Sequence, residues 1–428
     1  MKASILLEKI TARVYDVRLA ELYGQGALDH QRERYIKALN EFISLYGRER
    51  ETEIFSVPGR SEILGNHTDH NRGCVLAAAI DLDIIAIASA RTDGKITLKS
   101  EGFDADTVDT ALLTPDSYEN YSSSALIAGV CHGFCERGYA IGGFDAYTTS
   151  NVYKGSGLSS SAAFEVMIGN ILNHLYNGGK VDQPSLAKIA QYAENVFFGK
   201  PCGLMDQTAC AVGGFVAIDF EDPTKPIIEK MDYDLSKEGY ALCITNTGGN
   251  HADLNEDYAS IPAEMKAVAA YFGHDVLRGM SAFDVMSKIP ELREKFGDRA
   301  ILRALHFIAE NDRVKKATEA LKKGDTCAFF DNVKASGESS FMWLQNIYTT
   351  KNVHEQGLSL ALAVMGDALG KCTEKSAFRV HGGGFAGTVQ AFVPLSFVPE
   401  FTAAMDAVFG EGSCRALRVR ADGAIKVI

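Results

Sequence analysis

A short run of glycine and serine near the middle of the chain constrains the fold most strongly. It reads Gly155-Ser156-Gly157-Leu158-Ser159-Ser160-Ser161-Ala162-Ala163, and residues 164–177 after it have the apolar spacing of a helix. Small residues allow close approach of a backbone to a ligand, and the first turn of a helix offers unpaired N–H groups and a partial positive charge. The run therefore predicts an anion-binding turn. The alternative is a serine-capped helix after a glycine turn, although three serines exceed what a cap needs.

This turn is not a Walker loop, because the motif GxxxxGK[ST] does not occur in the chain. A second glycine-rich run, Gly382-Gly383-Gly384-Phe385-Ala386-Gly387, matches GxGxxG formally. A dinucleotide site would need a helix after it, whereas the following TVQAFV reads as a strand. We interpret the second run as a close backbone approach to a ligand or, alternatively, as a tight turn between strands.

The charge balance limits the partners of the chain. Lys and Arg number 43 and Asp and Glu 55, which gives a net charge of -12. Such a surface disfavours nonspecific binding to nucleic acid or to anionic membranes, so we expect neither as a partner. A phosphorylated ligand must then be held by a local device such as a helix end, a glycine loop, a metal ion or a placed arginine.

Length and apolar content indicate a large soluble protein. A chain of 428 residues exceeds one ordinary core and predicts two or three domains or one two-lobed unit. The most apolar segment, Cys74 to Ala88, contains Asp81 and Asp83, and no run reaches the roughly 18 apolar residues of a membrane span. The N-terminus lacks the features of a signal peptide, and nine scattered cysteines are typical of reduced thiols. We therefore expect a cytoplasmic protein.

The pattern of expected elements favours an α+β fold. Residues 1–50 predict one or two helices, 53–64 a strand that runs into a turn, and 75–90 one or two buried strands. Residues 91–94 read as a hairpin turn before a strand at 95–100. Helical spacing marks 117–137, 157–177, 184–198, most of 256–345 and 398–409, while strands are expected at 215–220, 240–248, 376–380, 388–393 and around 415–421. Strands and helices do not alternate regularly, which argues against a doubly wound sheet.

A polar stretch at residues 58–71 lies between two apolar strands. A loop that serves only solubility would use Lys and Glu, whereas this stretch offers Arg, Asn, Thr, Asp and two His, which suit a polyhydroxylated ligand. A solvated loop is the alternative. A metal site at His67, Asp69 and His70 has less support, because no third strong ligand lies near the two histidines.

Four motifs in this order resemble those of one enzyme family. PGRSEILGNHTDHNRG (58–73) is similar to the galactokinase signature GRxNLIGEHTDYNxG. GSGLSSSAA (155–163) resembles the second, ATP-binding motif of the GHMP kinases, and HGGGFAG (381–387) their third, glycine-rich motif. AENVFFGKPCGLMDQ (193–207) resembles the galactokinase segment AExxFxGxPCGIMDQ. The motifs span residues from about 55 to 390 and identify the chain as a member of the GHMP superfamily that is most similar to galactokinases.

The resemblance implies a two-lobed α+β fold in which ATP and a sugar meet in the cleft between the lobes. It implies a helical extension over residues 1–50, an N-terminal lobe over 51–235 with the sugar motif and the phosphate loop, and a C-terminal lobe over 236–428 with the third motif. It also implies Mg²⁺ as a cofactor, a small-molecule sugar as the second substrate, and a monomer or weak homo-oligomer.

The resemblance carries functional roles to matching positions. Asp206 corresponds to the aspartate beside the anomeric hydroxyl and Arg60 to the arginine that faces it. Mg²⁺ would be held by Ser160 and Glu194. The expected nucleotide-binding residues are Gly155, Ser156, Gly157, Leu158, Ser159, Ser160, Ser161, Ala162, Gly383 and Gly384. His67, Asp69, Gly203 and Tyr258 fall on sugar-contacting positions of the family. We also expect Glu62 and Asn66 to bind the sugar, although these two positions differ from the family pattern.

The specificity pocket departs from the family pattern. The glutamate before His-Thr-Asp is Asn66 here, the asparagine four residues earlier is Glu62, and His70 and His381 replace a tyrosine and a threonine. Loss of a carboxylate at Asn66 would remove repulsion toward an acidic sugar such as galacturonate, whereas Glu62 could return the carboxylate from nearby. We therefore expect a galactose 1-kinase, with a kinase for galacturonate or another galactose-like sugar as the alternative. A non-catalytic sugar sensor is the second alternative, although such sensors have an altered serine loop.

Overall fold

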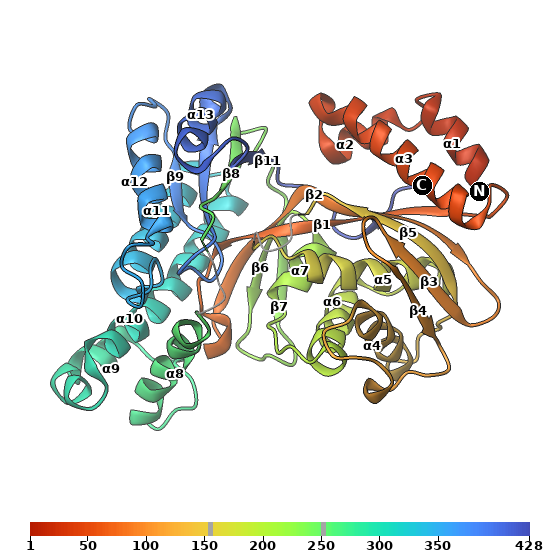
Figure 1. Ribbon diagram of the computed structural model, residues 1–428. Helices are drawn as coiled ribbons and strands as arrows, with labels where there is room; N and C mark the ends of the chain where they lie inside the picture. The colour runs from red at the N-terminus through yellow and green to blue at the C-terminus, as the bar shows by residue number, and fades with distance from the viewer. Residues whose placement is uncertain (153–156, 250–253) are drawn as a thin grey trace.

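The computed structural model describes residues 1–152, 157–249 and 254–428 of the chain. Helices and mixed sheets form two lobes, which lie side by side in Figure 1. The prediction of an α+β fold is confirmed. Within the described ranges, no helix combines the length and the apolar character that crossing a bilayer requires.

The larger sheet lies in the first lobe. Its strands follow the order β12-β1-β2-β5-β3-β4, and β6 and β7 extend it from β2. The members are β1 (Glu53–Leu64), β2 (Cys74–Ala90), β3 (Lys95–Ser100), β4 (Ala105–Asp109), β5 (Phe144–Ser150), β6 (Phe215–Asp219), β7 (Ile227–Met231) and β12 (Ile425–Lys426). One face packs on α4 (Ser123–Glu136), α5 (Ser160–Asn177), α6 (Gln183–Tyr192), the π-helical turn η4 (Ala193–Phe198) and α7 (Met205–Val212).

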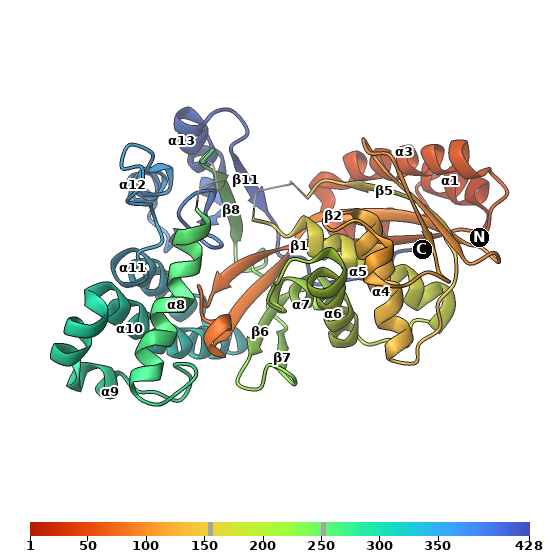
Figure 2. The same ribbon diagram turned by 60° about the horizontal axis from the view of Figure 1, so that its bottom comes forward.

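The opposite face of this sheet is covered by the N-terminal helices α1 (Ala3–Thr11), α2 (Asp16–Tyr23) and α3 (Leu28–Tyr46), as Figures 1 and 2 show. Ile84, Ala86 and Ala88 of β2 pack toward α5, and Ile85 and Ile87 pack toward these N-terminal helices. Because β2 is buried on both faces, it reads as a continuous apolar run in the sequence.

The second lobe is built around a four-stranded antiparallel sheet with the order β11-β8-β10-β9. Its strands are β8 (Tyr240–Asn246), β9 (Ala377–Val380), β10 (Thr388–Pro394) and β11 (Cys414–Leu417). The helices of this lobe are α8 (Asn255–Tyr271), α9 (Ala282–Ser287), α10 (Ile289–Lys322), α11 (Thr326–Ser339), the π-helical turn η5 (Ser340–Leu344), α12 (Gly357–Leu369) and α13 (Val398–Phe409). Residues of α10 and α11 join the core of the first lobe, so a continuous apolar core links the two.

Three sequence predictions need correction. Residues 1–50 form three α-helices and a short 3-10 helix at Gln25–Ala27, because the chain also breaks after α1, where Arg13 adopts a left-handed conformation without a glycine or proline. Residues 91–94 are not a hairpin turn: β5 lies between β2 and β3, and β3 runs parallel to β5. The last strand does not extend to residue 421, since β11 ends at Leu417 and β12 follows.

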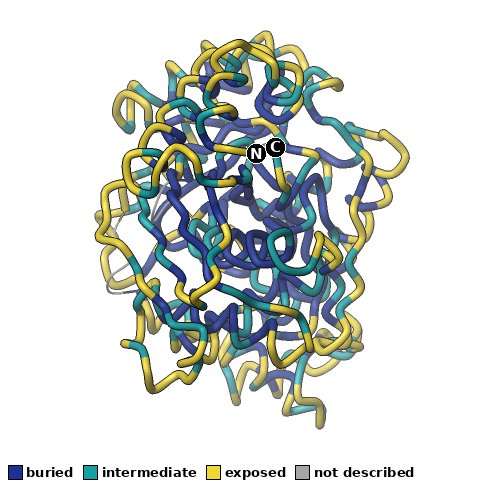
Figure 3. The backbone as a smooth tube through the Cα atoms, turned by 90° about the vertical axis from the view of Figure 1, so that its right-hand side faces the viewer, coloured by how far each residue is buried: buried dark blue, intermediate teal, exposed yellow. Residues whose placement is uncertain are grey.

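The chain ends meet at the edge of the larger sheet. The amide of Thr52 donates to the carbonyl of Met1 at 2.8 Å, and the amide of Ile54 to the carbonyl of Ile428 at 3.2 Å. Figure 3 shows the two ends next to each other on the surface, above a buried interior. Both termini therefore stabilise the strand that carries Arg60.

Candidate active site

Strand β1 positions the first site residue. The pairing of β1 with β2 shifts register between Pro58 and Arg60, and such bulges redirect side chains next to active sites. A Cβ atom on Gly59 would lie 2.8 Å from the Leu158 carbonyl oxygen, so this glycine lets β1 touch the phosphate loop. The Arg60 amide donates to the same oxygen at 3.1 Å.

Arg60 and Asp206 form a bidentate ion pair. The Arg60 Nε donates to Asp206 Oδ1 at 2.8 Å, and Nη2 donates to Oδ2 at 2.7 Å. The remaining guanidinium nitrogen, Nη1, donates to the Gly157 carbonyl. Asp206 lies in the first turn of α7, and its side chain is 34% exposed against 8% for Arg60. The more accessible partner is therefore the carboxylate.

The pair sets the charge state of the carboxylate. Burial alone would raise the pKa of Asp206, but the charge and hydrogen bonds of Arg60, with the Ser159 hydroxyl, outweigh it and hold the pKa below its usual value. Asp206 is thus ionised at neutral pH and can accept a proton. The arginine makes it a weaker base and keeps it available.

The phosphate loop reaches the same carboxylate. Ser159 precedes α5 with a left-handed backbone, φ 60°, and its side chain makes no capping bond to the helix. Its hydroxyl donates to Asp206 Oδ2 instead. The capping interpretation therefore does not hold at Ser159. Gly155 and Ser156 lie outside the described residues, whereas Gly157 to Ala162 lie at the start of α5, where backbone N–H groups favour anions.

A cluster of oxygen ligands lies beside this turn. Gln207 Nε2 donates to Glu194 Oε2 at 2.9 Å and to Glu165 Oε2 at 3.2 Å, and Lys200 Nζ lies 3.2 Å from Glu194 Oε1. Glu165 Oε1 is buried and has no partner among the described residues. Burial and the neighbouring charge of Glu194 raise the pKa of Glu165.

This donor set fits Mg²⁺. The ion prefers carboxylate and hydroxyl oxygens and is commonly held by one or two protein ligands together with phosphate oxygens. In the described part of the chain, no three His, Cys, Asp or Glu side chains form a complete metal site on their own. Glu194 and the Ser160 hydroxyl have the chemistry that such a shared site needs, whereas the raised pKa of Glu165 favours its neutral, protonated form.

The residues expected to bind sugar fall into two groups. A Cβ atom on Gly203 would lie 2.6 Å from Asp69 Oδ2, so the loop before α7 lies directly against the loop after β1. Tyr258 of α8 donates its hydroxyl to the Gly384 carbonyl at 2.8 Å, and His67 Nε2 lies 2.9 Å from the Gly383 carbonyl. The third motif thus contacts the sugar-motif loop and α8, and the site draws on both lobes.

Asn66 has a supporting place. It is fully buried, its Nδ2 donates to Glu62 Oε1 at 2.8 Å and to the Gly382 carbonyl at 2.7 Å, and its Oδ1 accepts from Asn346 at 2.7 Å. These bonds, with a longer one from Ser340, occupy the whole amide. The donors and acceptors of the Asn66 side chain are therefore used within the protein, and none of these bonds supports the expected contact of Asn66 with the sugar.

The sequence did not predict that His381 and Lys200 lie close to the Arg60–Asp206 pair. His381 Nδ1 lies 2.7 Å from the Thr388 hydroxyl, and a Cβ atom on Gly157 would lie 3.4 Å from His381 Cε1. Burial, with the charges of Arg60 and Arg379, lowers the pKa of His381 to about 3, so the ring is neutral. Lys200 was also missed, although a lone cation within the FFGKPCG segment was a signal for it.

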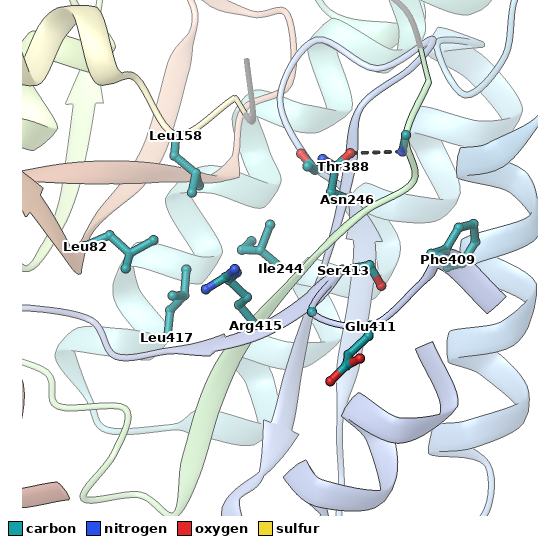
Figure 4. Close-up of a pocket in the computed structure, with 12 residues that line it drawn as sticks. Leu82, Leu158, Ile244, Asn246, Thr388, Phe409, Glu411, Ser413, Arg415 and Leu417 are labelled. Carbon is teal, nitrogen blue, oxygen red and sulfur yellow. Dashed lines mark hydrogen bonds between the residues drawn. The ribbon is translucent and has the colours of Figure 1, made fainter. Parts of the chain in front are cut away.

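A cavity of about 410 Å³ lies between the two sheets and borders the phosphate loop. In Figure 4, Arg415 lies among Leu82, Ile244 and Leu417, while Leu158 closes the cavity from above. Neither Arg60 nor Asp206 lines it. The cavity is therefore separate from this ion pair.

Comparisons with known proteins agree with this geometry. The model of the GHMP kinase N-terminal domain matches residues 122–214, and that of the galactokinase galactose-binding signature matches residues 40–90. A galactokinase of Streptomyces coelicolor is 33% identical over 385 residues, with 88% of this chain and 94% of the relative covered. A galactokinase of Clostridium tetani is 29% identical, with 83% and 87% covered.

Solved structures agree on the fold. The Lactococcus lactis galactokinase complexed with galactose superposes with a TM-score of 0.75 at 24% identity, with 92% of this chain and all of that one covered. The Methanococcus jannaschii mevalonate kinase superposes with a TM-score of 0.59 at 13% identity, with 86% and 98% covered.

The fold and the phosphate loop define a small-molecule kinase of the GHMP superfamily. Within it, the relative that is 33% identical over most of the chain decides the family. The chain belongs to the galactokinase family.

Proposed function

We propose that this protein transfers the γ-phosphoryl group of ATP to the anomeric hydroxyl of galactose, giving galactose 1-phosphate and ADP. One observation carries the proposal. Asp206, an ionised and partly exposed carboxylate, is held by Arg60 and by Ser159, the residue that directly precedes α5. A carboxylate in that position can orient an acceptor hydroxyl toward a triphosphate bound at the helix N-terminus.

Asp206 would accept the proton of the anomeric hydroxyl as the oxygen bonds to phosphorus. Its lowered pKa limits its strength as a base, so alignment contributes more than deprotonation. Arg60 would hold the carboxylate in place and stabilise the negative charge that spreads over the transferred group. The ionised form of Asp206 is present at every pH near neutrality.

The main-chain N–H groups at the start of α5 would bind the phosphates of ATP, in the segment from Gly157 to Ala162. Gly383 and Gly384, with Gly155 and Ser156, complete the nucleotide-contacting set that we propose. Ser160 and Glu194 would hold Mg²⁺, which neutralises phosphate charge when bound. This assignment gives an acidic chain a local means of holding a polyanion.

The sugar would lie against the contact of Asp69 with Gly203. His67 and Tyr258, which contact the carbonyls of the third motif, would bind it as well. These groups offer both hydrogen-bond donors and acceptors, which a polyhydroxylated ligand requires. We place the boundary of the two lobes between 51–235 and 236–428, after a helical extension over 1–50, except that β12 at the end of the chain returns to the sheet of the first lobe. The proposed sugar site lies where the two lobes meet.

We also infer that the protein acts on small molecules in the cytoplasm, as a monomer or weak homo-oligomer and without nucleic acid or membrane partners. The net charge of -12 supports the absence of polyanionic partners.

A screen of ADP release tests the proposal. Galactose, galacturonate, N-acetylgalactosamine, glucose and arabinose would be compared at equal concentration, with phosphorus NMR to locate the phosphate on the sugar. We expect the largest kcat/KM for galactose and phosphate on the anomeric oxygen. Sugar binding without ADP release, or a preference for galacturonate, would contradict the proposal.

A further inference from the structure

A buried carboxylate lies two residues beyond Arg60 on the same strand. Side chains two apart on a strand point to the same face, and the pairing of residues 60–62 with β2 is regular, so Glu62 and Arg60 share a face. Its side chain is only 10% exposed. Glu62 is close enough to Arg60 and to Asp69 to feel the charge of both. It therefore lies near both Arg60 of the ion pair and Asp69 of the proposed sugar contacts.

The two carboxylate oxygens of Glu62 have different surroundings. Oε1 accepts from Asn66 Nδ2 at 2.8 Å and lies 3.8 Å from Arg379 Nη2. Oε2 has no hydrogen-bond partner among the described residues, yet it is not one of the fully buried unpartnered atoms. One oxygen is thus held by the protein, and the other has no partner there and is not completely shielded from solvent.

Asn66, which holds Glu62, is itself fixed. Its side-chain amide donates to the Gly382 carbonyl and accepts from Asn346, and its backbone carbonyl oxygen lies 3.0 Å from His306 Nε2. Side chains from the second lobe therefore fix Asn66, and Asn66 fixes Glu62. A carboxylate held in this way loses little entropy when it accepts a further hydrogen bond.

We propose that Glu62 is a specificity-determining residue, which accepts a hydrogen bond from a sugar hydroxyl through Oε2 and repels sugars that carry a carboxylate, with Asn66 as its positioning residue. This inference rests on the proposed function. Neutral galactose-like sugars then donate to the carboxylate, whereas a uronic acid would bring a second negative charge to it, which costs affinity in a buried site.

The charge of Glu62 supplies a second readout. Burial raises the pKa of Glu62 to about 7, although Arg379 and Arg60 oppose the rise and Asp69 adds to it. Above that pKa the carboxylate is the better acceptor, and below it the neutral acid no longer repels an anion. The KM for galactose should therefore rise as the pH falls through neutrality, and discrimination against galacturonate should weaken.

The test compares the unaltered protein with Glu62→Gln, which keeps the shape and removes the charge. A hydrogen bond to a charged group is worth about a 10- to 100-fold change in binding, so the galactose KM should rise by about that factor while kcat changes far less. The ratio of galacturonate to galactose kcat/KM should rise about tenfold or more, and the pH dependence of KM should disappear. Glu319→Gln, an exposed glutamate on α10, is the matched control.

Two further measurements separate the possible failures. Asn66→Ala should raise the galactose KM with kcat largely retained, and the pH profile of KM in the unaltered protein needs no substitution at all. If the unaltered protein phosphorylates galactose but Glu62→Gln leaves KM, the sugar ratio and the pH profile unchanged, the inference is wrong and the proposed function stands. If no sugar is phosphorylated, the proposed function fails. In that case, equal affinities of the unaltered protein and Glu62→Gln for galactose in calorimetry would overturn the inference as well.

Discussion

At the scale of single residues, the site depends on the ion pair of Arg60 and Asp206. The two partners share a bidentate contact but differ in their exposure to solvent. Arg60 is almost fully buried and gives all three donating nitrogens to the protein, two to Asp206 and one to the Gly157 carbonyl. Asp206 remains partly exposed. Arg60 therefore holds the carboxylate and the loop, and Asp206 is the partner that can contact the substrate.

Replacement of Arg60 should move the pH dependence of catalysis. The arginine lowers the pKa of Asp206 against the effect of burial, so Arg60→Met should raise that pKa. Because the ionised form is the active one, the acid limb of the kcat/KM profile should shift to higher pH. We also expect kcat to fall by about 10²- to 10³-fold.

The lysine variant is the matched control for this experiment. Arg60→Lys keeps the charge and loses the bidentate geometry, so its acid limb should shift less than that of Arg60→Met. The pH–rate profiles of both variants measure the effect. An unchanged acid limb in Arg60→Met would show that Asp206 does not control it.

At the scale of elements, the contact between β1 and the phosphate loop holds the two motifs together. Gly59 permits it, because any side chain there would lie 2.8 Å from the Leu158 carbonyl oxygen. Gly59→Ala should push the loop away, with a loss of stability of about 1–3 kcal/mol. We also expect a higher KM for ATP, which steady-state kinetics and thermal unfolding would measure together.

Gly26→Ala is the control for this prediction. A Cβ atom on Gly26 meets nothing within 4 Å, so the substitution should change neither stability nor KM. If Gly59→Ala behaved like Gly26→Ala, the contact between strand and loop would not matter for nucleotide binding.

The elements show what a sequence can predict and what it cannot. The runs at 53–64, 215–220 and 388–393 became strands as expected, because their patterns are local. The position of β5 between β2 and β3 depends on pairs such as Thr97 with Asp145 and Ile84 with Ser150, which are too far apart in the sequence for a local pattern to encode. For the same reason, motif matching placed Asp206 and Arg60 but not the contact of His381 with Gly157, nor the burial of Asn66.

At the scale of the whole molecule, a buried polar network ties the chain ends to the sheet. Asp83 of β2 is fully buried and accepts from Arg34 at 2.6 Å, Tyr23 at 2.5 Å and Arg420 at 3.1 Å, and also from Ser56. These partners come from α3, α2, the C-terminal segment and β1. Local sequence patterns did not predict this network, because Arg34, Tyr23 and Arg420 lie 49, 60 and 337 positions from Asp83.

Asp83→Ala should therefore destabilise the whole protein. The substitution leaves Arg34 and Arg420 as uncompensated buried charges, and the loss of one partner of a buried ion pair costs about 3–5 kcal/mol. Denaturant unfolding would measure the change. Since Asp83 is not among the proposed site residues, the galactose KM of the folded fraction should stay the same.

Glu49→Gln is the comparison for this prediction, since it breaks an exposed ion pair with Lys2. We expect no measurable change from it. Equal stability of Asp83→Ala and Glu49→Gln would contradict the assigned importance of the network.

The central claim is that Asp206 serves the chemical step. The direct measurement is galactose-dependent ADP release by Asp206→Asn, with galactose binding followed by calorimetry and with Asp93→Asn, an exposed ion-pair residue, as the control. We predict a fall in kcat of about 10²- to 10⁴-fold with galactose affinity nearly unchanged. A folded Asp206→Asn protein that retains the kcat of the unaltered enzyme would contradict the account.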